Sequence, residues 1–282
     1  MSKSYGMVID VARCTGCCNC FFACKDENCN EAHEGYTAAQ PMTGQKWMEV
    51  KEIERGEYPK VNIRSVPMFC AHCDNPGCFK QAKDGAVYKR EDGIVIIDPE
   101  KSKGQKDIIN TCPYRRIFWN EELMIPQKCD MCAHLLDRGY EMPRCAETCP
   151  TGAIEFGDFN DPESEVSKRL KLNPEALMPQ FEMGERVLYL NYPKNFIAGS
   201  VVYTDEQGRE QCCEGVKITF DGSDGTHKEL ISDNYGDFWC EGLETNVRFT
   251  VKFELPGHKT VVRENVKTIK SVNLGDIFME KE

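Results

Sequence analysis

Seventeen cysteines dominate the chemistry open to this 282-residue chain. Fourteen of them lie before residue 150, and three lie after residue 200. Thiolates in short, regularly spaced groups bind zinc or iron–sulfur clusters. Disulfide frameworks, in contrast, are typical of much shorter secreted domains. The cysteines therefore indicate metal binding.

The first run of cysteines has the spacing of one half of a bacterial ferredoxin. It reads Cys14-x2-Cys17-x2-Cys20-x3-Cys24. In such a run the first three thiolates bind one [4Fe–4S] cluster, and the fourth binds the neighbouring cluster. This one segment therefore predicts ligands for two different clusters.

Three further cysteine segments follow, and two of them are incomplete. The segment Cys70-x2-Cys73-x4-Cys78 lacks a fourth ligand, because Ala82 stands at the expected position. The next segment consists of Cys112 and a proline alone. The last segment is complete but contains a long insertion, and its members are Cys129, Cys132, Cys145 and Cys149.

Nested pairing of the segments explains both gaps. If the outer segments pair with each other, and the inner segments likewise, three complete ligand sets result. They are Cys14, Cys17, Cys20 and Cys149 (set A); Cys24, Cys129, Cys132 and Cys145 (set B); and Cys70, Cys73, Cys78 and Cys112 (set C). A fourth set would consist of Ala82, Ser102, Gln105 and Ile108, which are not usual cluster ligands. Because one whole set is missing and the others are intact, we expect three [4Fe–4S] clusters.

Structural zinc is the alternative, since paired Cys-x2-Cys units are common in zinc sites. Zinc does not explain the three-plus-one spacing with a trailing Cys-Pro, nor the joint loss of one set. Five cysteines fall outside the sets. Cys18 and Cys29 are expected to be small core residues near the ligands, and Cys212, Cys213 and Cys240 to be buried free thiols.

The elements predicted around the sets are short. A strand is expected over 7–11, a hairpin over 86–98 with its turn at 91–93, and a helical segment over 99–111. Residues 162–172 are expected to form a helix, and 186–192 a strand. The predicted fold of residues 1–194 is two nested bacterial-ferredoxin-like modules with an insertion at about 30–68.

From about Asn195 the composition becomes β-rich. Short apolar runs cover 196–203, 216–220, 247–253 and 260–266, with a further strand near Phe238, and turn clusters separate them. This pattern predicts an all-β sandwich over 195–282, which resembles the prealbumin-like and carboxypeptidase-regulatory domains. The whole chain is therefore expected to be of the α+β class.

The overall charge narrows the possible partners. The net charge is −11, and because nucleic-acid binding requires a basic face, no nucleic-acid partner is expected. No apolar stretch approaches the roughly 20 residues that span a bilayer, and the first residues lack the apolar run of a secretory signal. We therefore expect that the chain has no membrane anchor. We also expect that it is located in the cytoplasm.

The four-segment layout resembles the electron-transfer subunits of the dimethyl-sulfoxide-reductase family of molybdenum enzymes. The similarity covers roughly the first two-thirds of the chain. It implies a heterodimer with a large catalytic subunit, which would carry molybdenum on molybdopterin guanine dinucleotide. No active site is then expected on this chain.

Three segments narrow the resemblance: WMEVKEIERGEYP, KREDGIVIIDPEKSKGQKDIINTCPY and QKCDMCAHLLD. With the missing fourth set and the added β domain, they resemble the small subunits of transhydroxylases and related phenol-transforming enzymes of anaerobes. The partner would then be a transhydroxylase, hydroxylase or dehydroxylase of polyhydroxylated aromatics such as pyrogallol. Two alternatives stay open: a free-standing polyferredoxin, and the electron-transfer subunit of another molybdenum reductase.

Overall fold

The computed structural model describes residues 2–29 and 31–282 and divides the chain into two compact units. Unit 1 spans Met1–Glu52 and Arg64–Tyr192, and unit 2 spans Ile53–Ile63 and Pro193–Glu282. The sequence placed all of 30–68 in the first domain, whereas the middle of that insertion groups with unit 2. That 1–194 and 195–282 fold as separate domains stays a prediction.

The helices of unit 1 are short. They are α1 (Asn19–Asn28), α2 (Gly77–Gln81), α3 (Ala133–Asp137), α4 (Arg144–Glu147) and α5 (Glu165–Leu170). Three 3₁₀ helices cover Val11–Arg13, Lys106–Thr111 and Pro179–Phe181. The predicted helix at 162–172 is confirmed by α5. The helical prediction for 99–111 is wrong in its first half, where the chain forms turns, and only Lys106–Thr111 winds into a 3₁₀ helix.

Unit 1 contains a three-stranded sheet that adjoins the first and last cysteine segments. Its middle strand β1 (Tyr5–Asp10) pairs antiparallel with β8 (Ile154–Asp158) and parallel with β9 (Val187–Leu190). Met7, Val8 and Ile9 are completely buried, so both faces of β1 are covered. The predicted strands at 7–11 and 186–192 are thereby confirmed. Because β1 leads directly into the first cysteine loop and β8 follows the last, this sheet fixes both ends of set A.

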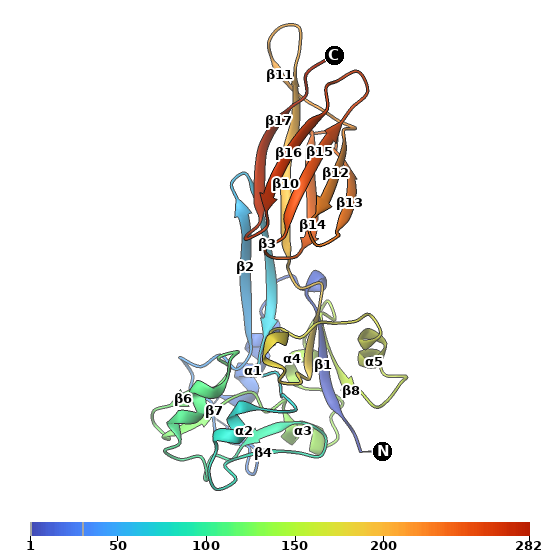
Figure 1. Cartoon of the computed structure of the whole chain (residues 1–282). Helices are drawn as coiled ribbons and strands as arrows, with labels where there is room; N and C mark the ends of the chain where they lie inside the picture. The colour runs from blue at the N-terminus through green and yellow to red at the C-terminus, as the bar shows by residue number, and fades with distance from the viewer. Residues whose placement is uncertain (1, 30) are drawn as a thin grey trace. The chain divides into compact units, whose positions relative to one another are not determined.

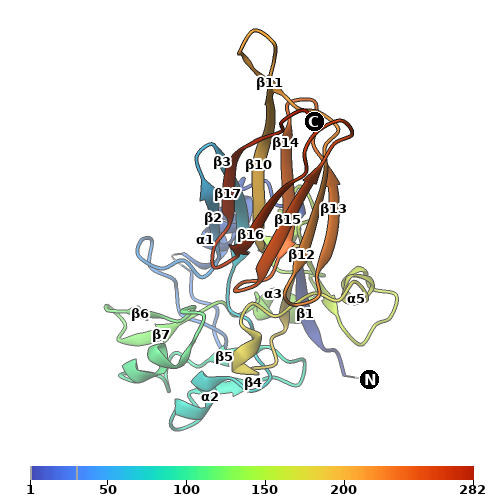
Figure 2. The ribbon, with the colours of Figure 1, turned by 45° about the horizontal axis from the view of Figure 1, so that its top comes forward.

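Three hairpins complete the strands of this part of the chain. They are β2 (Glu49–Glu57) with β3 (Lys60–Met68), β4 (Val87–Lys89) with β5 (Val95–Ile97), and β6 (Phe118–Asn120) with β7 (Ile125–Gln127). The β4–β5 pair confirms the predicted hairpin at 86–98. Figure 2 shows α2 beside this hairpin, and the contacts between α2 and β4 agree.

Unit 2 contains two four-stranded sheets around one apolar core (Figure 1). In one sheet β10 (Asn195–Thr204) pairs with β11 (Glu210–Cys212), β14 (Asp237–Leu243) and β17 (Val272–Phe278). The other has the order β13 (His227–Ile231), β12 (Lys217–Gly222), β15 (Arg248–Glu254) and β16 (Val261–Lys267). Exposed and buried residues alternate along β15, so one face of its sheet lies against the core. Every strand predicted after 195 is confirmed, whereas β11, β13 and β17 were not predicted.

The tip of the β2–β3 hairpin belongs to unit 2 through polar contacts. The ammonium of the buried Lys60 lies 2.5 Å from a carboxylate oxygen of Asp237 and 5.8 Å from the centre of the Trp239 ring. The side-chain amide of Asn62 donates to Glu241 at 2.9 Å. These contacts join residues that lie far apart in the sequence, which is why sequence patterns alone did not reveal them.

Within the described residues, no helix is both long enough and apolar enough to span a membrane.

Candidate metal centres

The structure gathers the twelve predicted ligands into three groups in unit 1. All four thiols of set A line one cavity, and all four of set C line another. In set B, negative charge on Cys24 or on Cys145 raises the pKa of Cys129, and negative charge on Cys145 raises the pKa of Cys132, so these thiols are close to one another. Cysteines that the sequence grouped are therefore neighbours in space, while their role as cluster ligands stays a prediction.

Most of these thiols are removed from water. Burial raises the pKa of Cys20 and of Cys24 to about 12, and that of Cys78 to about 11. Burial also raises the pKa of Cys145, and the charges of Cys24 and Cys20 raise it further. Iron binds the thiolate rather than the thiol, so metal binding at these sites must release protons.

The three Cys-x2-Cys loops share one unusual backbone conformation. The residue before the second cysteine is Gly16 in set A, Met131 in set B and His72 in set C, and its φ is +71°, +58° and +44°, respectively. Glycine adopts this conformation freely, whereas histidine and methionine rarely do. Turns of this kind direct successive N–H groups into one concavity, as is common around phosphates and iron–sulfur clusters.

Main-chain N–H groups reach several of the cysteine sulfurs. The donors are those of His72 to Cys70 at 3.5 Å, Met131 to Cys129 at 3.3 Å, and Arg116 to Cys112 at 3.5 Å. Such hydrogen bonds stabilise negative charge on sulfur and tune cluster potentials. The donor set thus fits an anionic thiolate cluster.

The turn after Cys149 favours its thiolate form. Burial alone would raise the pKa of Cys149, but main-chain N–H groups of Thr151, Ala153 and Ile154 and the Thr151 hydroxyl lower it. The hydroxyl lies 3.8 Å from the sulfur. This turn is the Cys-Pro motif of the sequence, and it gives set A a thiol that loses its proton more easily than an ordinary cysteine.

The fourth loop keeps the backbone turn of the other loops but has no thiols. Gly104, at the corresponding position, has a φ of +79°. Ser102 is completely buried, and within the described part of the chain its hydroxyl has no hydrogen-bond partner. The amide of Gln105 bonds to main-chain groups between α2 and β4. Ile108 and Ala82 pack in one apolar group, so the space beside the loop is filled by side chains.

Set B lies between the other two sets. Negative charge on Cys20, in set A, raises the pKa of Cys145 in set B, so these two thiols are neighbours. Negative charge on Cys70, in set C, likewise raises the pKa of Cys129 in set B. The sets therefore follow one another through unit 1 in the order A, B, C.

A buried lysine lies between sets B and C. The Lys128 ammonium donates to the main-chain oxygens of Val95 and, at 3.0 Å, of Cys129. Burial lowers the pKa of Lys128, but the charges of Cys70, Cys78 and Cys129 raise it above its ordinary value. The ammonium thus offsets the negative charge that thiolates would place at both sets.

Set A has the most exposed ligands. Cys17 is exposed, and Cys14 and Cys149 are half-buried. Sets B and C each contain three buried thiols and one half-buried thiol, Cys129 or Cys112. Set A is therefore the most accessible of the three sets to another molecule.

The cysteines outside the sets differ in burial. Cys29, Cys213 and Cys240 are buried, as predicted, and Cys18 is half-buried. Cys212 is exposed, so its predicted burial is wrong. The cause is register, since side chains alternate along β11 and the adjacent Cys213 faces the core.

A cluster of Glu27, His33 and His134 beside set B also has potential metal ligands. The two imidazole rings are stacked, 3.5 Å apart and within 11° of parallel. Lone pairs in the planes of parallel rings do not converge on one ion. Arg144 occupies the second oxygen of Glu27 at 2.8 Å, so the cluster serves packing and charge balance.

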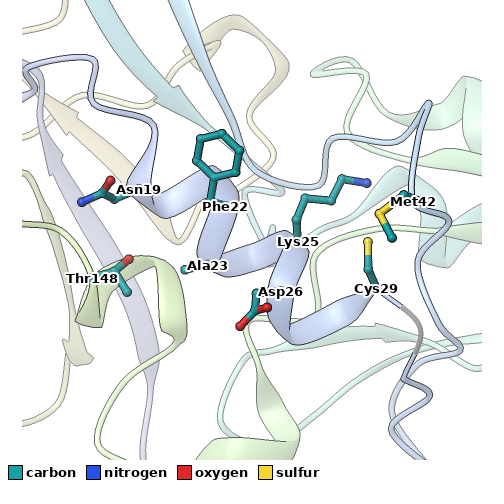
Figure 3. Close-up of a pocket in the computed structure, with 8 residues that line it drawn as sticks. All are labelled: Asn19, Phe22, Ala23, Lys25, Asp26, Cys29, Met42 and Thr148. Carbon is teal, nitrogen blue, oxygen red and sulfur yellow. The ribbon is translucent and has the colours of Figure 1, made fainter.

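A hollow of about 600 Å³ lies along α1 and contains none of the twelve set cysteines (Figure 3). Its lining residues are Asn19, Phe22, Ala23, Lys25, Asp26, Cys29, Met42 and Thr148. Phe22 and Met42 are each 64% exposed, so the hollow is open to water. Its charged groups are one lysine and one aspartate, which do not form a catalytic arrangement.

Known proteins are similar to this chain in sequence. Residues 61–159 match the 4Fe-4S dicluster domain family. The chain is 38% identical to the pyrogallol hydroxytransferase small subunit of Pelobacter acidigallici, over 98% of this chain and 99% of the relative. The chain belongs to the iron–sulfur subunits of the dimethyl-sulfoxide-reductase family of molybdenum enzymes.

Other members of this family are more distant and match a shorter part of the chain. A tetrathionate reductase subunit of Salmonella typhimurium is 33% identical over 68% of this chain and 74% of the relative. The iron–sulfur subunit of the arsenate respiratory reductase of Shewanella is 29% identical over 66% of this chain and 95% of the relative. The chain is thus a family subunit for electron transfer with [4Fe–4S] clusters, and the predicted resemblance is confirmed.

Sequence reasoning missed the residues that surround the sulfurs. His72 and Lys128 line the set C cavity, and Thr151 contacts Cys149. A signal was present, since each residue stands within two positions of a predicted ligand. Their roles depend on burial and on hydrogen bonds, which spacing does not report.

Proposed function

We propose that this chain carries three [4Fe–4S] clusters, one on each of sets A, B and C, and transfers electrons for a molybdenum enzyme. The supporting observation is the gathering of twelve thiols into three groups of four, of which set A reaches the surface. Each bound cluster would supply one-electron redox chemistry. The chain itself supplies the thiolates, the N–H donors and the buried surroundings.

The partner is proposed to be a large catalytic subunit that binds molybdenum on molybdopterin guanine dinucleotide. The two chains would form a heterodimer in which this chain is non-catalytic. Because Cys17 and its neighbours are the exposed ligands, we place the partner near set A. The similarity to the pyrogallol hydroxytransferase small subunit favours a transhydroxylase, hydroxylase or dehydroxylase of polyhydroxylated aromatics.

The fold is proposed to consist of two nested ferredoxin-like modules and a prealbumin-like sandwich. The shared left-handed residue in all four loops supports a common origin of the half-sites. The two sheets of unit 2 around one core are compatible with the sandwich. A cytoplasmic location is also proposed, since cysteines of this number and spacing suit thiolate ligands that a reducing compartment keeps free of disulfides.

Anaerobic purification of the tagged chain from cells that make it tests the proposal. We expect one large subunit per chain, with molybdenum and organic pterin, and activity of the pair toward phenols such as pyrogallol. A chain that purifies alone with its iron and reduces several unrelated acceptors would instead be a polyferredoxin. A pair that acts on tetrathionate or arsenate and not on phenols would contradict the substrate class alone.

A further inference from the structure

His72 has an unusual position in set C. It is the left-handed residue of the Cys70-x2-Cys73 loop, and its side chain is completely buried. Its ring nitrogen Nδ1 accepts a hydrogen bond from the main-chain N–H of Val95 at 3.1 Å. A main-chain N–H is always the donor, so Nδ1 carries no proton. The single proton of the neutral ring is therefore on Nε2.

This second nitrogen has no hydrogen-bond partner among the described residues. A buried N–H without an acceptor is costly and rare in native proteins. His72 lines the same cavity as the four thiols of set C. The missing acceptor is therefore to be sought in whatever occupies that cavity.

A buried water is a poor candidate for the acceptor. Such a water needs two to four polar partners. The other hydroxyl and amino side chains around the cavity are engaged. Lys128 donates to the main-chain oxygens of Val95 and Cys129, the Thr111 hydroxyl donates to the main-chain oxygen of Ile108, and the Tyr114 hydroxyl donates to Glu185. A sulfur of a bound cluster would accept the N–H without further partners.

We propose that Nε2–H of His72 donates a hydrogen bond to a sulfur of the [4Fe–4S] cluster on set C, an inference that rests on the proposed function. A donor stabilises the reduced, more negative cluster more than the oxidised one, so the bond raises the reduction potential. The main-chain group of Val95 positions the donor. Residue 72 thereby tunes set C, the set farthest from set A in the order of the three.

Two substitutions distinguish the role of Nδ1 from the role of Nε2. In His72→Asn the side-chain oxygen can replace Nδ1 as acceptor for Val95, and no donor replaces Nε2. In His72→Gln the amide nitrogen can replace Nε2. Asparagine also tolerates the left-handed backbone of this position. His33→Asn, at a buried histidine beside set B, is the matched control.

The test is an anaerobic redox titration of the purified complex followed by electron paramagnetic resonance. We expect His72→Asn to lower the potential of the set C cluster alone, His72→Gln to stay close to the wild type, and His33→Asn to leave set C unchanged. In the wild-type complex, electron–nuclear double resonance should show an exchangeable proton, and nitrogen from ¹⁵N-labelled histidine, coupled to that cluster.

An unchanged set C potential in an iron-loaded His72→Asn complex would overturn the proposal. Absence of the histidine coupling in the wild type would overturn it as well, even if His72→Asn fails to assemble. Absence of [4Fe–4S] signals from every set would instead contradict the proposed function itself.

Discussion

Cys112 lies beside Cys70, although the whole β4–β5 hairpin and the Ser102 loop separate them in the chain. Burial raises the pKa of Cys112, and the neighbouring charge of Cys70 raises it further. Both thiols line one cavity with Cys73 and Cys78. The innermost pairing of the four segments is therefore present in space.

Cys112→Ser is expected to remove the set C cluster and to leave those of sets A and B. Serine oxygen is a poor ligand for cluster iron, and the other three thiols of set C cannot close the site alone. Iron analysis should show a loss of about four atoms per chain, and electron paramagnetic resonance should show one signal lost. Cys29→Ser, at a buried thiol outside the sets, is the control and should keep all the iron. Loss of the set B signal in Cys112→Ser would refute the nested pairing.

Ser102→Cys is expected to add no iron. One thiol cannot hold a cubane, and Ile108 and Ala82 fill the neighbouring space. Because the buried Ser102 hydroxyl lacks a partner, the substitution should also stabilise the chain, by on the order of 1 kcal/mol. Iron content and the free energy of unfolding measure both effects. A fourth cluster in this variant would show that the loop still encloses a cluster-sized space.

Removal of iron by a chelator is expected to consume protons at pH 8. The thiols of Cys20 and Cys24, with pKa values of about 12, and Cys78, with about 11, are protonated well below those values once the metal has left. Titration at constant pH measures the uptake. In the same sample, hydrogen exchange should rise around the three sets, while the apolar core of unit 2 stays protected. No proton uptake during iron loss would argue against thiolate ligands.

Asp237→Asn is expected to loosen residues 53–63 from the rest of unit 2. The Lys60 ammonium is buried and would lose its carboxylate. Removing one partner of a fully buried pair costs about 3–5 kcal/mol, and the partial exposure of Asp237 reduces this to roughly 1–3 kcal/mol. Hydrogen exchange of 53–63 and the free energy of unfolding report the effect. Glu229→Gln, in the exposed pair with Lys217, should change stability by less than about 0.5 kcal/mol.

Cysteine spacing predicted which thiols meet, because ligand geometry constrains spacing directly. Alternation of apolar residues predicted the central strands of unit 2, because successive side chains of a strand face the core and the solvent in turn. The β2–β3 hairpin was hidden, since its strands, such as EVKEIERGE, are half-exposed and carry little apolar pattern. The contacts of Lys60 and His72 were hidden as well, because each depends on a partner that is remote in the sequence.

The residue with positive φ in each loop also shows what sequence patterns do not predict. Glycine at positions 16 and 104 is compatible with a turn, so these two turns could be anticipated. His72 and Met131 adopt the same conformation against their own preference, and only the surrounding structure imposes it. The four segments that the spacing identified as equivalents thus share this turn as well.

The iron and sulfide content of the anaerobically purified chain tests the central claim most directly. Three [4Fe–4S] clusters on sets A, B and C predict about twelve iron atoms and about twelve inorganic sulfides per chain, with no zinc. About sixteen of each, or tightly bound zinc in place of iron, would contradict the assignment of the twelve cysteines.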